Sequence, residues 1–444
     1  MNNEQINSSQ VPEGYKQTEV GVIPEDWEIS TLGKHASFKT GPFGSLLHKS
    51  DYVEGGIPAI NPMQINDGQI EPTSSMSVTE EAAKTLSNFR LYAGDIVIAR
   101  RGEMGRCAYV NPEQEGWLCG SGSMIVRVSN EVDARFIQRV LSSPRAINAI
   151  ENASVGSTMI NLNQSSLSNL LISLPSDKRE QNEIATTLSD IDALIAKLDK
   201  LIAKKRHLKT ATMQQLLTGK KRLPGFGEGK GYQQTEVGVI PEDWEVVTIQ
   251  SITSLVTNGF VGKATIHYTE QDDGITYIQG YNVEANSFNF NGIKKVTPEF
   301  HRIHQKSCLK KDDLLTVQTG EVGLTTIVPK YLEGSNCHAL IISRFKRKKV
   351  DPWFYAHYFN SPTGRLRLRD LEVGTTMKHI NVADLLAWKV PYPENKEEQS
   401  EIATVLSDID TEITALETRR TKTQAIKQGM MQELLTGRTR LVNS

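Results

Sequence analysis

The longest regular pattern of apolar residues in the chain runs through the stretch Lys178–Leu217. The pattern alternates steps of four and three residues, and seven of its ten positions are apolar, which is the 3.5-residue period of a coiled-coil seam. Asp177 and Glu180 have the spacing of a capping box at the start, and Gly219 stands where a left-handed C-cap belongs. The stretch therefore predicts one helix of about 60 Å. The pattern consists of Ile184, Leu188, Ile191, Ile195, Leu198, Ile202, Lys205, Lys209, Thr212 and Leu216.

A second stretch repeats this pattern 218 residues later, with Asn395 and Glu398 as the predicted cap and Gly437 as the predicted stop. Glu183–Asp192 and Glu401–Asp410 differ at one position. Two long helices with matching stripes favour a pair that packs together over two unrelated core helices. The second pattern consists of Ile402, Leu406, Ile409, Ile413, Leu416, Arg420, Thr423, Lys427, Met430 and Leu434.

The whole chain is a tandem duplication. The segment Gly14–Glu28 returns as Gly231–Glu245 with one difference, Lys16 against Gln233. Weaker matches lie between them, among them Gly102–Gly105 with Gly320–Gly323. The interiors otherwise agree only at scattered positions, so the two halves are expected to hold the same place in an assembly and to recognise different things.

Each half is predicted to be a mixed α/β globule followed by its long helix. Short runs rich in β-branched residues between Gly, Pro or Asn predict strands, and two runs that stop before Ser-Pro predict helices. The strands are Trp27–Leu32, Gly56–Asn61, Asp95–Arg100 and Ser123–Val128, and the helices are Asp133–Leu141 and Asp351–Asn360. The predicted domains are a lead 1–13, globule 14–176, helix 177–219, Gly-rich basic linker 220–230, globule 231–394, helix 395–437 and tail 438–444.

The composition agrees with a globular protein of more than one domain and adds no further detail. A chain of 444 residues needs more than one core, and 38% hydrophobic with 23% charged residues is ordinary for a globular protein. No apolar run reaches the ~18 residues of a membrane span, and the polar start lacks the layout of a signal peptide. Four scattered cysteines without a CxxC indicate a reducing cytoplasm. A net charge of −2 argues against a protein that coats nucleic acid indiscriminately, but it leaves local basic patches open.

The sequence contains no recognisable catalytic centre. The loop Gly44–Ser50 lacks the second glycine of a phosphate-binding loop, and the glycines of Gly225–Gly231 neither follow a strand nor open a helix, so they predict a flexible joint. The Asn-Pro-Pro-aromatic tetrapeptide of amino-methyltransferases is absent. His301 and His304 do not form a convincing metal-ligand pattern. We therefore expect no catalytic residue and no metal site.

Basic residues gather in glycine-flanked loops of both halves. Cations of this kind neutralise phosphates, and Arg, Asn, Gln, Ser and Thr on rigid loops read base edges. Any one cluster is better explained as solvated surface, but recurrence in both halves makes a functional interpretation equally good. The clusters are Arg100, Arg101 and Arg106; Lys294 and Lys295; Lys310 and Lys311; Arg344–Lys349; and Arg365, Arg367 and Arg369.

Four motifs, each present twice in the same order, give the chain a family resemblance. They are IPEDWE (Ile23–Glu28, Ile240–Glu245), GxTM (Gly156–Met159, Gly374–Met377), EQxEIATxLSDID (Glu180–Asp192, Glu398–Asp410) and MQxLLTG (Met213–Gly219, Met431–Gly437). With these motifs the chain resembles, over essentially its whole length, the specificity subunit of type I restriction–modification systems.

The resemblance implies a mixed α/β protein with two target-recognition domains, held apart by two conserved helices that pack as an antiparallel coiled coil in a pseudo-twofold repeat. Each domain would read one half of a bipartite site in double-stranded DNA, and the helix pair would set the gap. It also implies two methyltransferase subunits and restriction subunits as cytoplasmic partners, with no membrane. S-adenosylmethionine, ATP and Mg²⁺ would belong to those partners, and this chain would hold no cofactor.

Candidate contact residues follow from loop context and side-chain type. The DNA-binding candidates are Lys39, Thr40, Ser45, Arg100, Arg101, Arg106, Ser157, Thr158, Asn161, Lys263, Gln318, Thr319, Thr375, Lys378 and Asn381. The predicted helix-pair seam comprises Ile184, Leu188, Ile191, Ile195, Leu198, Ile202, Ile402, Leu406, Ile409, Ile413 and Leu416.

Two other functions remain open from the sequence. One is a coiled-coil adaptor whose globules bind proteins, although this gives no reason for two divergent interiors with basic loops. The other is an enzyme, such as a methyltransferase or nuclease fused to its own recognition domains, against which the missing motifs argue.

Overall fold

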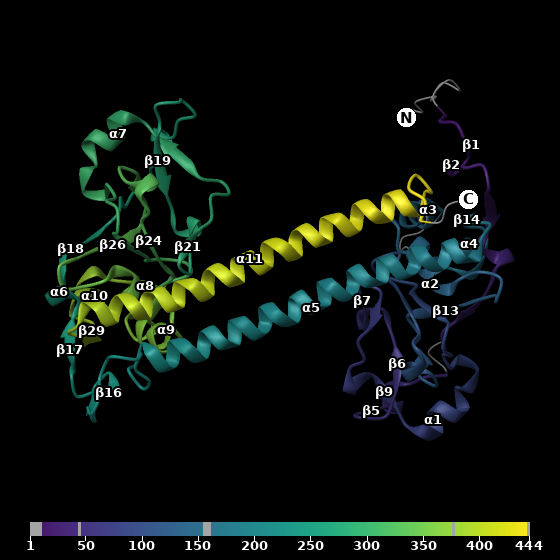
Figure 1. Cartoon of the computed structure of the whole chain (residues 1–444), viewed down its shortest axis with the longest axis horizontal. Helices are drawn as coiled ribbons and strands as arrows, with labels where there is room; N and C mark the ends of the chain where they lie inside the picture. Colours follow the sequence, from purple (N-terminus) through teal and green to yellow (C-terminus); the bar gives the residue numbers. More distant parts are fainter. Residues whose placement is uncertain (1–10, 43–45, 154–160, 375–377, 442–444) are drawn as a thin grey trace. The chain divides into compact units, whose positions relative to one another are not determined.

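The structure is a computed structural model that describes residues 11–42, 46–153, 161–374 and 378–441. It divides into two compact units (Figure 1). Unit 1 comprises Met1–Lys197 and Arg419–Ser444, and unit 2 comprises Leu198–Thr418. Each long helix therefore contributes one part to each unit.

The main sheet of unit 1 has four antiparallel strands in the order β11-β10-β13-β4. The two central strands are fully or largely buried because apolar residues occupy both of their faces. This confirms the predicted strands Asp95–Arg100 and Ser123–Val128. The strands are β4 (Ala36–Thr40), β10 (Ile96–Ala99), β11 (Cys107–Tyr109) and β13 (Ser123–Val128).

Smaller elements surround this sheet. A second sheet has the order β12-β6-β9-β5, in which β12 and β6 are parallel. The remaining strands form the pairs β1–β2, β3–β14 and β7–β8. Their bounds are β1 (Tyr15–Thr18), β2 (Gly21–Pro24), β3 (Trp27–Thr31), β5 (Tyr52–Val53), β6 (Ile57–Ile60), β7 (Ile65–Asn66), β8 (Gln69–Ile70), β9 (Ser77–Val78), β12 (Leu118–Cys119) and β14 (Leu171–Pro175). The helices are α1 (Glu80–Thr85), α2 (Ala134–Leu141), α3 (Pro144–Ala153) and α4 (Gln164–Ser168).

Unit 2 repeats this plan, which confirms the duplication at the level of the fold. Its main sheet has the equivalent order β24-β23-β26-β18, and its second sheet again contains a parallel pair, β19 with β25. The strands are β15 (Tyr232–Thr235), β16 (Gly238–Pro241), β17 (Trp244–Thr248), β18 (Thr253–Asn258), β19 (Ile275–Ile278), β20 (Val283–Glu284), β21 (Ser287–Phe288), β22 (Lys294–Val296), β23 (Leu314–Val317), β24 (Thr325–Ile327), β25 (Asn336–Cys337), β26 (Leu340–Phe345), β27 (Glu372–Val373), β28 (His379–Ile380) and β29 (Lys389–Pro393). The helices are α6 (Ile249–Ile252), α7 (Pro298–Ile303), α8 (Pro352–Asn360), α9 (Pro362–Arg369) and α10 (Val382–Ala387).

The two long helices are α5 (Lys178–Leu216) and α11 (Lys396–Leu434), as predicted. Gly219 and Gly437 follow them with φ of +69° and +70°, the left-handed conformation that ends a helix. The predicted seam residues are buried or half-buried, whereas Leu194, Leu201 and Leu208 on α5 are exposed. In unit 2 the helices run antiparallel, because Lys209 pairs with Asp410 while Arg206 pairs with Glu417.

The predicted capping boxes are wrong. Asp177 accepts a hydrogen bond from the backbone N–H of Arg179, and Asn395 accepts one from Glu397. The carboxylates of Glu180 and Glu398 do not return to the helix start. They are 1% exposed and bind arginines far away in the sequence.

Each hydrophobic core contains the start of one long helix and the end of the other. The unit 1 core includes Ile184 and Leu188 from α5 together with Leu434 from α11. The unit 2 core includes Leu406 from α11 and Leu216 from α5. Each globule is therefore closed by the helix of the opposite repeat, which the expected division into two consecutive globules did not anticipate.

Candidate nucleic-acid interface

Several of the candidate residues lie at one end of the main sheet in each unit. In unit 1, β4 and β10 finish at this end and β13 begins there, as the pairs Ala99↔Ser123 and Met124↔Thr40 require. We call it the loop end. The opposite end contacts the start of α5, where Lys178 donates a hydrogen bond to Asn130 O. The loop end is thus free of the helix start.

In unit 1 the loop end carries several exposed polar groups. Lys39 is exposed, with Nζ 5.5 Å from the centre of the Phe89 ring. Thr40 accepts a hydrogen bond of 3.1 Å from Gln164 Nε2, which fixes the start of α4 against β4. Arg101 is exposed and directly follows the buried strand end. Lys39 and Arg101 are therefore exposed to a ligand at this end of the sheet, whereas Thr40 is half-buried.

Two arginines of the same loop are committed to the protein. Arg100 is only 6% exposed, and its Nε donates to Leu162 O at 3.3 Å. Burial, with the charge of Arg101, lowers the pKa of its guanidinium. Arg106 pairs with Glu103 and donates to Pro62 O. Arg100 therefore supports the loop from inside the unit, through its bond to Leu162 O.

In unit 2 the candidates Gln318, Thr319 and Lys378 come together. Gln318 Nε2 donates to Ile380 O at 3.0 Å, and Thr319 forms a β-bridge with His379, the residue after Lys378. Lys263 is exposed on the segment that follows β18 at the same end of the sheet. The structure thus joins segments about 60 residues apart into one loop end.

The remaining candidates are placed less centrally or not at all. Asn161 is exposed next to Leu162, and Asn381 is exposed with its side chain bound to Asp384. Ser45, Ser157, Thr158 and Thr375 lie outside the described residues.

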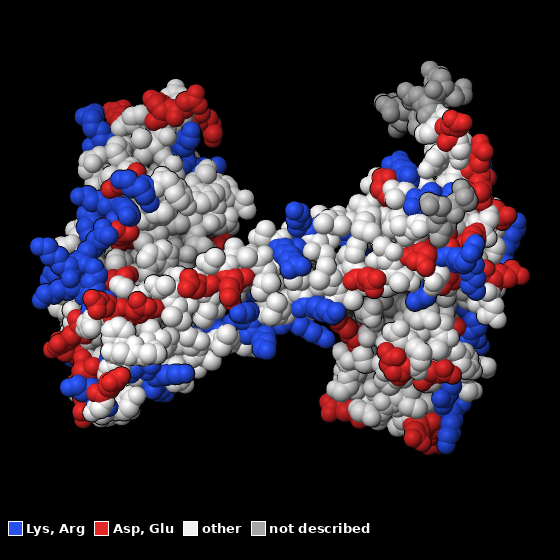
Figure 2. Space-filling view, viewed as in Figure 1, with Lys and Arg blue, Asp and Glu red and all other residues white. Residues whose placement is uncertain are grey.

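The most basic run of the sequence, Arg344–Lys349, lies at the opposite end of the unit 2 sheet. Arg344 binds Asp313 at 2.7 Å, Arg347 pairs with Asp312, and Lys346 donates to Ser251 O. These cations are largely matched by acids or carbonyls. Figure 2 shows Lys and Arg interspersed with Asp and Glu over the face in view. The number of basic residues therefore does not identify a DNA-binding surface, whereas their position and their ion-pair partners do.

Sequence reasoning missed an ionic cluster around a buried glutamate in each unit. In unit 1, Arg440 binds Glu180 at 2.6 and 2.8 Å and Asp26 at 2.9 and 2.8 Å. Trp27 Nε1 donates to Glu180 at 3.3 Å. Hydrogen bonds to Glu180 and Asp26 raise the pKa of Arg440, and the bond from Arg440 lowers the pKa of Asp26. The segment after α11 is thereby fastened to the start of α5.

Unit 2 contains the same cluster from the other repeat. Arg222, in the linker, binds Glu398 and Asp243, and Trp244 Nε1 donates to Glu398 at 3.1 Å. Burial lowers the pKa of Arg222, but hydrogen bonds to the two carboxylates outweigh it and the pKa is raised. The linker predicted as a flexible joint thus contains an anchored residue. The sequence signal for these clusters was an arginine three residues after each helix-ending glycine, Gly219 and Gly437.

A second pair of equivalent networks joins each globule to the long helices. In unit 1, Arg139 of α2 binds Asp192 at 2.6 Å, and Lys427 binds the other oxygen of Asp192. In unit 2 the corresponding residues are His357, Asp410 and Lys209.

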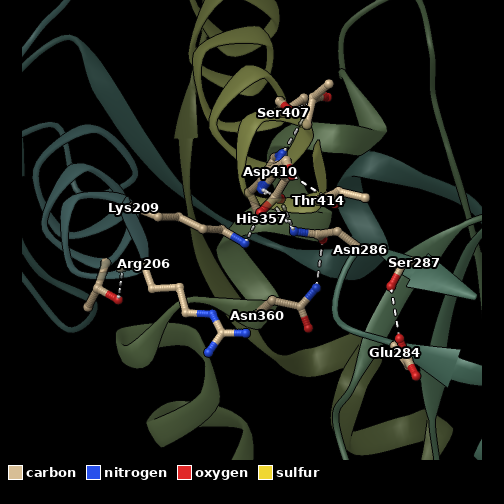
Figure 3. A network of polar contacts seen from close by, with 12 residues as sticks. Arg206, Lys209, Glu284, Asn286, Ser287, His357, Asn360, Ser407, Asp410 and Thr414 are labelled. Carbon is tan, nitrogen blue, oxygen red and sulfur yellow. Dashed lines mark hydrogen bonds and ion pairs between the residues drawn. The ribbon is translucent and has the colours of Figure 1, made fainter. Parts of the chain in front are cut away.

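Figure 3 shows how the unit 2 network is built around His357. Asn286, in the turn between β20 and β21, donates to His357 Nδ1 at 3.0 Å and to Asp410 at 3.3 Å. His357 Nε2 lies 3.1 Å from Ser407 Oγ. Burial lowers the pKa of His357 to about 4, against the raising effect of Asp410. The histidine is therefore neutral at pH 7. Because Nδ1 accepts the hydrogen bond from Asn286, the proton of the neutral ring is on Nε2.

Within the described ranges, no three His, Cys, Asp or Glu side chains are grouped to hold a metal ion. None of the helices there is both long and apolar enough to cross a membrane. All four cysteines are free thiols.

Comparison with known proteins gives concordant matches. The family described as "Type I restriction modification DNA specificity domain" matches residues 24–204 and 241–428. The chain is 27% identical over 436 residues to a putative type I restriction enzyme specificity subunit, MjaX, of Methanocaldococcus jannaschii, covering 97% of both chains. It is 22% identical to the EcoBI specificity subunit of Escherichia coli, covering 86% of this chain and 78% of that one. The crystal structure of a type I restriction–modification S subunit from M. genitalium has the same fold, with a TM-score of 0.58 at 17% identity, covering 92% and 96% of the two chains.

Proposed function

Because the chain belongs to the type I restriction modification DNA specificity family, we propose that it supplies the DNA sequence specificity of a type I restriction–modification complex. One observation carries the proposal beyond family membership. The two units share the strand order of the main sheet and the ionic cluster at the start of a long helix, but their loop ends present different side chains. A common frame with two different recognition surfaces fits a bipartite site in which each unit reads one half.

The long helices fit the task of spacing the two half-sites. We propose that α5 and α11 pack as an antiparallel coiled coil along their common seam and so fix the gap between the half-sites. A chain with pseudo-twofold symmetry offers equivalent surfaces to two copies of one partner. We propose two methyltransferase subunits as those copies, joined by restriction subunits.

The catalytic chemistry is assigned to the partners. We propose that this chain is non-catalytic and that S-adenosylmethionine, ATP and Mg²⁺ bind the partner subunits. Methylation of adenine requires the base to be flipped out of the duplex into a catalytic pocket. This chain would hold the DNA while the partner closes on the base. The adaptor alternative is not favoured, because the relatives carry the name of specificity subunits.

Genome-wide mapping of N6-methyladenine tests the proposal. The chain is co-expressed with its cognate methyltransferase in an unmodified host, and methylation is mapped at single-base resolution. We expect a split motif of two short specific parts around a fixed gap, lost when this chain is omitted. A continuous motif, or methylation that persists without this chain, would contradict the proposal.

Arg101→Ala should relax the specificity of one half-site only. Arg101 is exposed at the loop end of unit 1, and a lost base contact costs about 1–3 kcal/mol of discrimination. The methylation map should become degenerate at one position and remain unchanged in the other half-site. Lys34→Ala, which removes an exposed cation before β4 at the opposite end of the sheet, is the matched control. Uniform weakening on all sequences would instead mark Arg101 as a phosphate contact.

A further inference from the structure

A polar pocket lies beside the loop end of unit 2. Its volume is about 390 Å³. One wall is the loop Gly320–Val322, which directly follows the candidate residues Gln318 and Thr319. The other walls come from α9, from Glu372 and from Lys378. The pocket therefore opens at the same end of the sheet as the proposed base-reading residues.

Three cations line the pocket, and the protein does not fully neutralise them. Arg365 is half-buried, and its Nη1 donates to Val322 O at 2.8 Å. Burial first, and then the neighbouring charge of Arg369, lowers the pKa of Arg365. Arg369 is exposed and makes no ion pair within the part of the chain that the structure describes. Two positive groups held together in this way are stabilised by an anion placed between them.

The acidic residues of the pocket leave a net charge of +1. Lys378 pairs with Glu372 at 3.0 Å, which cancels one cation. Glu321 is exposed, and its charge raises the pKa of Arg365 only as a minor contribution. Three cations against two carboxylates match the single negative charge of a phosphodiester.

The equivalent place in unit 1 is built differently. At the offset of 218 residues, Arg365 and Arg369 correspond to Ile147 and Glu151. Ile147 packs so closely on Gly105 that a Cβ atom there would lie 2.3 Å from Ile147 Cγ1. An apolar side chain and an acid therefore stand in unit 1 where unit 2 has its two arginines.

The strand-end loop shows the reverse exchange. Arg100 and Arg101 of unit 1 correspond to the uncharged Gln318 and Thr319 of unit 2. Each unit thus brings two arginines to the same glycine-flanked loop, from the strand end in unit 1 and from α9 in unit 2. Both loops therefore have arginines beside them, but in unit 1 only Arg101 is exposed, whereas Arg100 is buried.

We propose that the unit 2 pocket binds one backbone phosphate of duplex DNA, with Arg369 as the main contact and Arg365 as its support. The proposal rests on the proposed function and identifies the ligand of one site within it. A phosphate contact fixes the position of the protein on DNA without reading sequence. Gln318 and Thr319, next to the pocket, are then set against the base edges.

The test is the salt dependence of DNA binding by the complex that contains the Arg369→Ala chain. The probes are a duplex that contains the sequence motif at which the complex methylates DNA, and a scrambled duplex of the same length. We expect roughly threefold to tenfold weaker binding of both duplexes at low salt. The slope of log K against log salt should become less steep by about 0.9, the value for one lost phosphate contact. The sequence motif at which the Arg369→Ala complex methylates DNA should be the same as for the wild type.

Two variants serve as controls. Arg302→Ala removes an exposed arginine from α7 of the same unit and should leave the salt slope unchanged. Arg369→Lys keeps the charge and should retain the wild-type slope. An unchanged slope for Arg369→Ala would overturn the proposal, and so would weakening confined to the motif duplex, because that marks a base contact. If the wild-type complex did not prefer the motif duplex, the proposed function would fail, while the scrambled duplex would still decide the phosphate contact.

Discussion

Arg222→Ala is expected to lower the free energy of unfolding of unit 2 by about 3–5 kcal/mol. Its side chain is 12% exposed and binds Glu398, whose side chain is 1% exposed, together with Asp243. Removing the arginine leaves a buried carboxylate whose remaining donor among the described residues is Trp244 Nε1. An uncompensated buried charge costs far more than the net stabilisation of the intact pair, so the effect of the single change is large.

Urea unfolding with fluorine-labelled tryptophan measures this effect in each unit separately. Unit 1 contains Trp27 and Trp117, and unit 2 contains the other three tryptophans. Arg440→Ala should weaken unit 1 in the same way, because Arg440 holds Glu180 and Asp26. Lys221→Ala, an exposed neighbour of Arg222, should change stability by less than about 0.5 kcal/mol.

A double change separates the buried charge from general loss of packing. Glu398→Gln removes the orphaned charge, so adding it to Arg222→Ala should recover part of the lost stability. A single Arg222→Ala variant within about 1 kcal/mol of the wild type would contradict the assigned role, since it would mean that Glu398 is solvated without its partner.

Acidification is expected to destabilise unit 2 through His357. The pKa of this histidine is about 4 in the folded protein and about 6.5 in the unfolded chain. Between these values the unfolded state binds more protons, so stability is present above pH 6.5 and falls as the pH falls towards 4. The expected loss relative to pH 7 is about 2 kcal/mol at pH 5 and about 3 kcal/mol at pH 4.

His357→Gln provides the measurement. The difference in pH dependence between the wild type and this variant isolates His357 from its charged neighbours Asp410, Lys209 and Asp351. The range from pH 7 to pH 5 is the most informative, because carboxylates titrate below it. Unit 1 is an internal control, since Arg139 takes the place of His357 there. Equal pH slopes for the wild type and His357→Gln would contradict the buried neutral histidine.

The sequence predicted the elements that follow from periodicity and failed where a side chain has a distant partner. The 3.5-residue pattern located α5 to within one residue at each end, because an apolar stripe must face a core. The capping box at Asp177 was wrong because Glu180 pairs with Arg440, 260 residues away. A local motif carries no information about a partner at that distance.

The candidate site was predicted in part for the same reason. Loop context brought out both Arg100 and Arg101, but only the fold distinguishes the buried residue from the exposed one. Arg365, Arg367 and Arg369 formed one basic cluster in the sequence. The helix turns Arg367 towards Tyr358 and Lys389, whereas Arg365 and Arg369, four residues apart, share the face that lines the pocket.

Closure of unit 1 by the segment after α11 has a consequence for biosynthesis. Tyr15 bonds Gly437 O, and Asp26 binds Arg440, across sequence separations of 422 and 414 residues. The first globule to leave the ribosome therefore waits for residues translated more than 400 positions later, while unit 2 is formed by one continuous segment. Contacts of such separation form late. In a nascent chain, unit 2 should thus finish folding before unit 1. The surface around Trp27 should stay uncovered until the segment after α11 has packed on it.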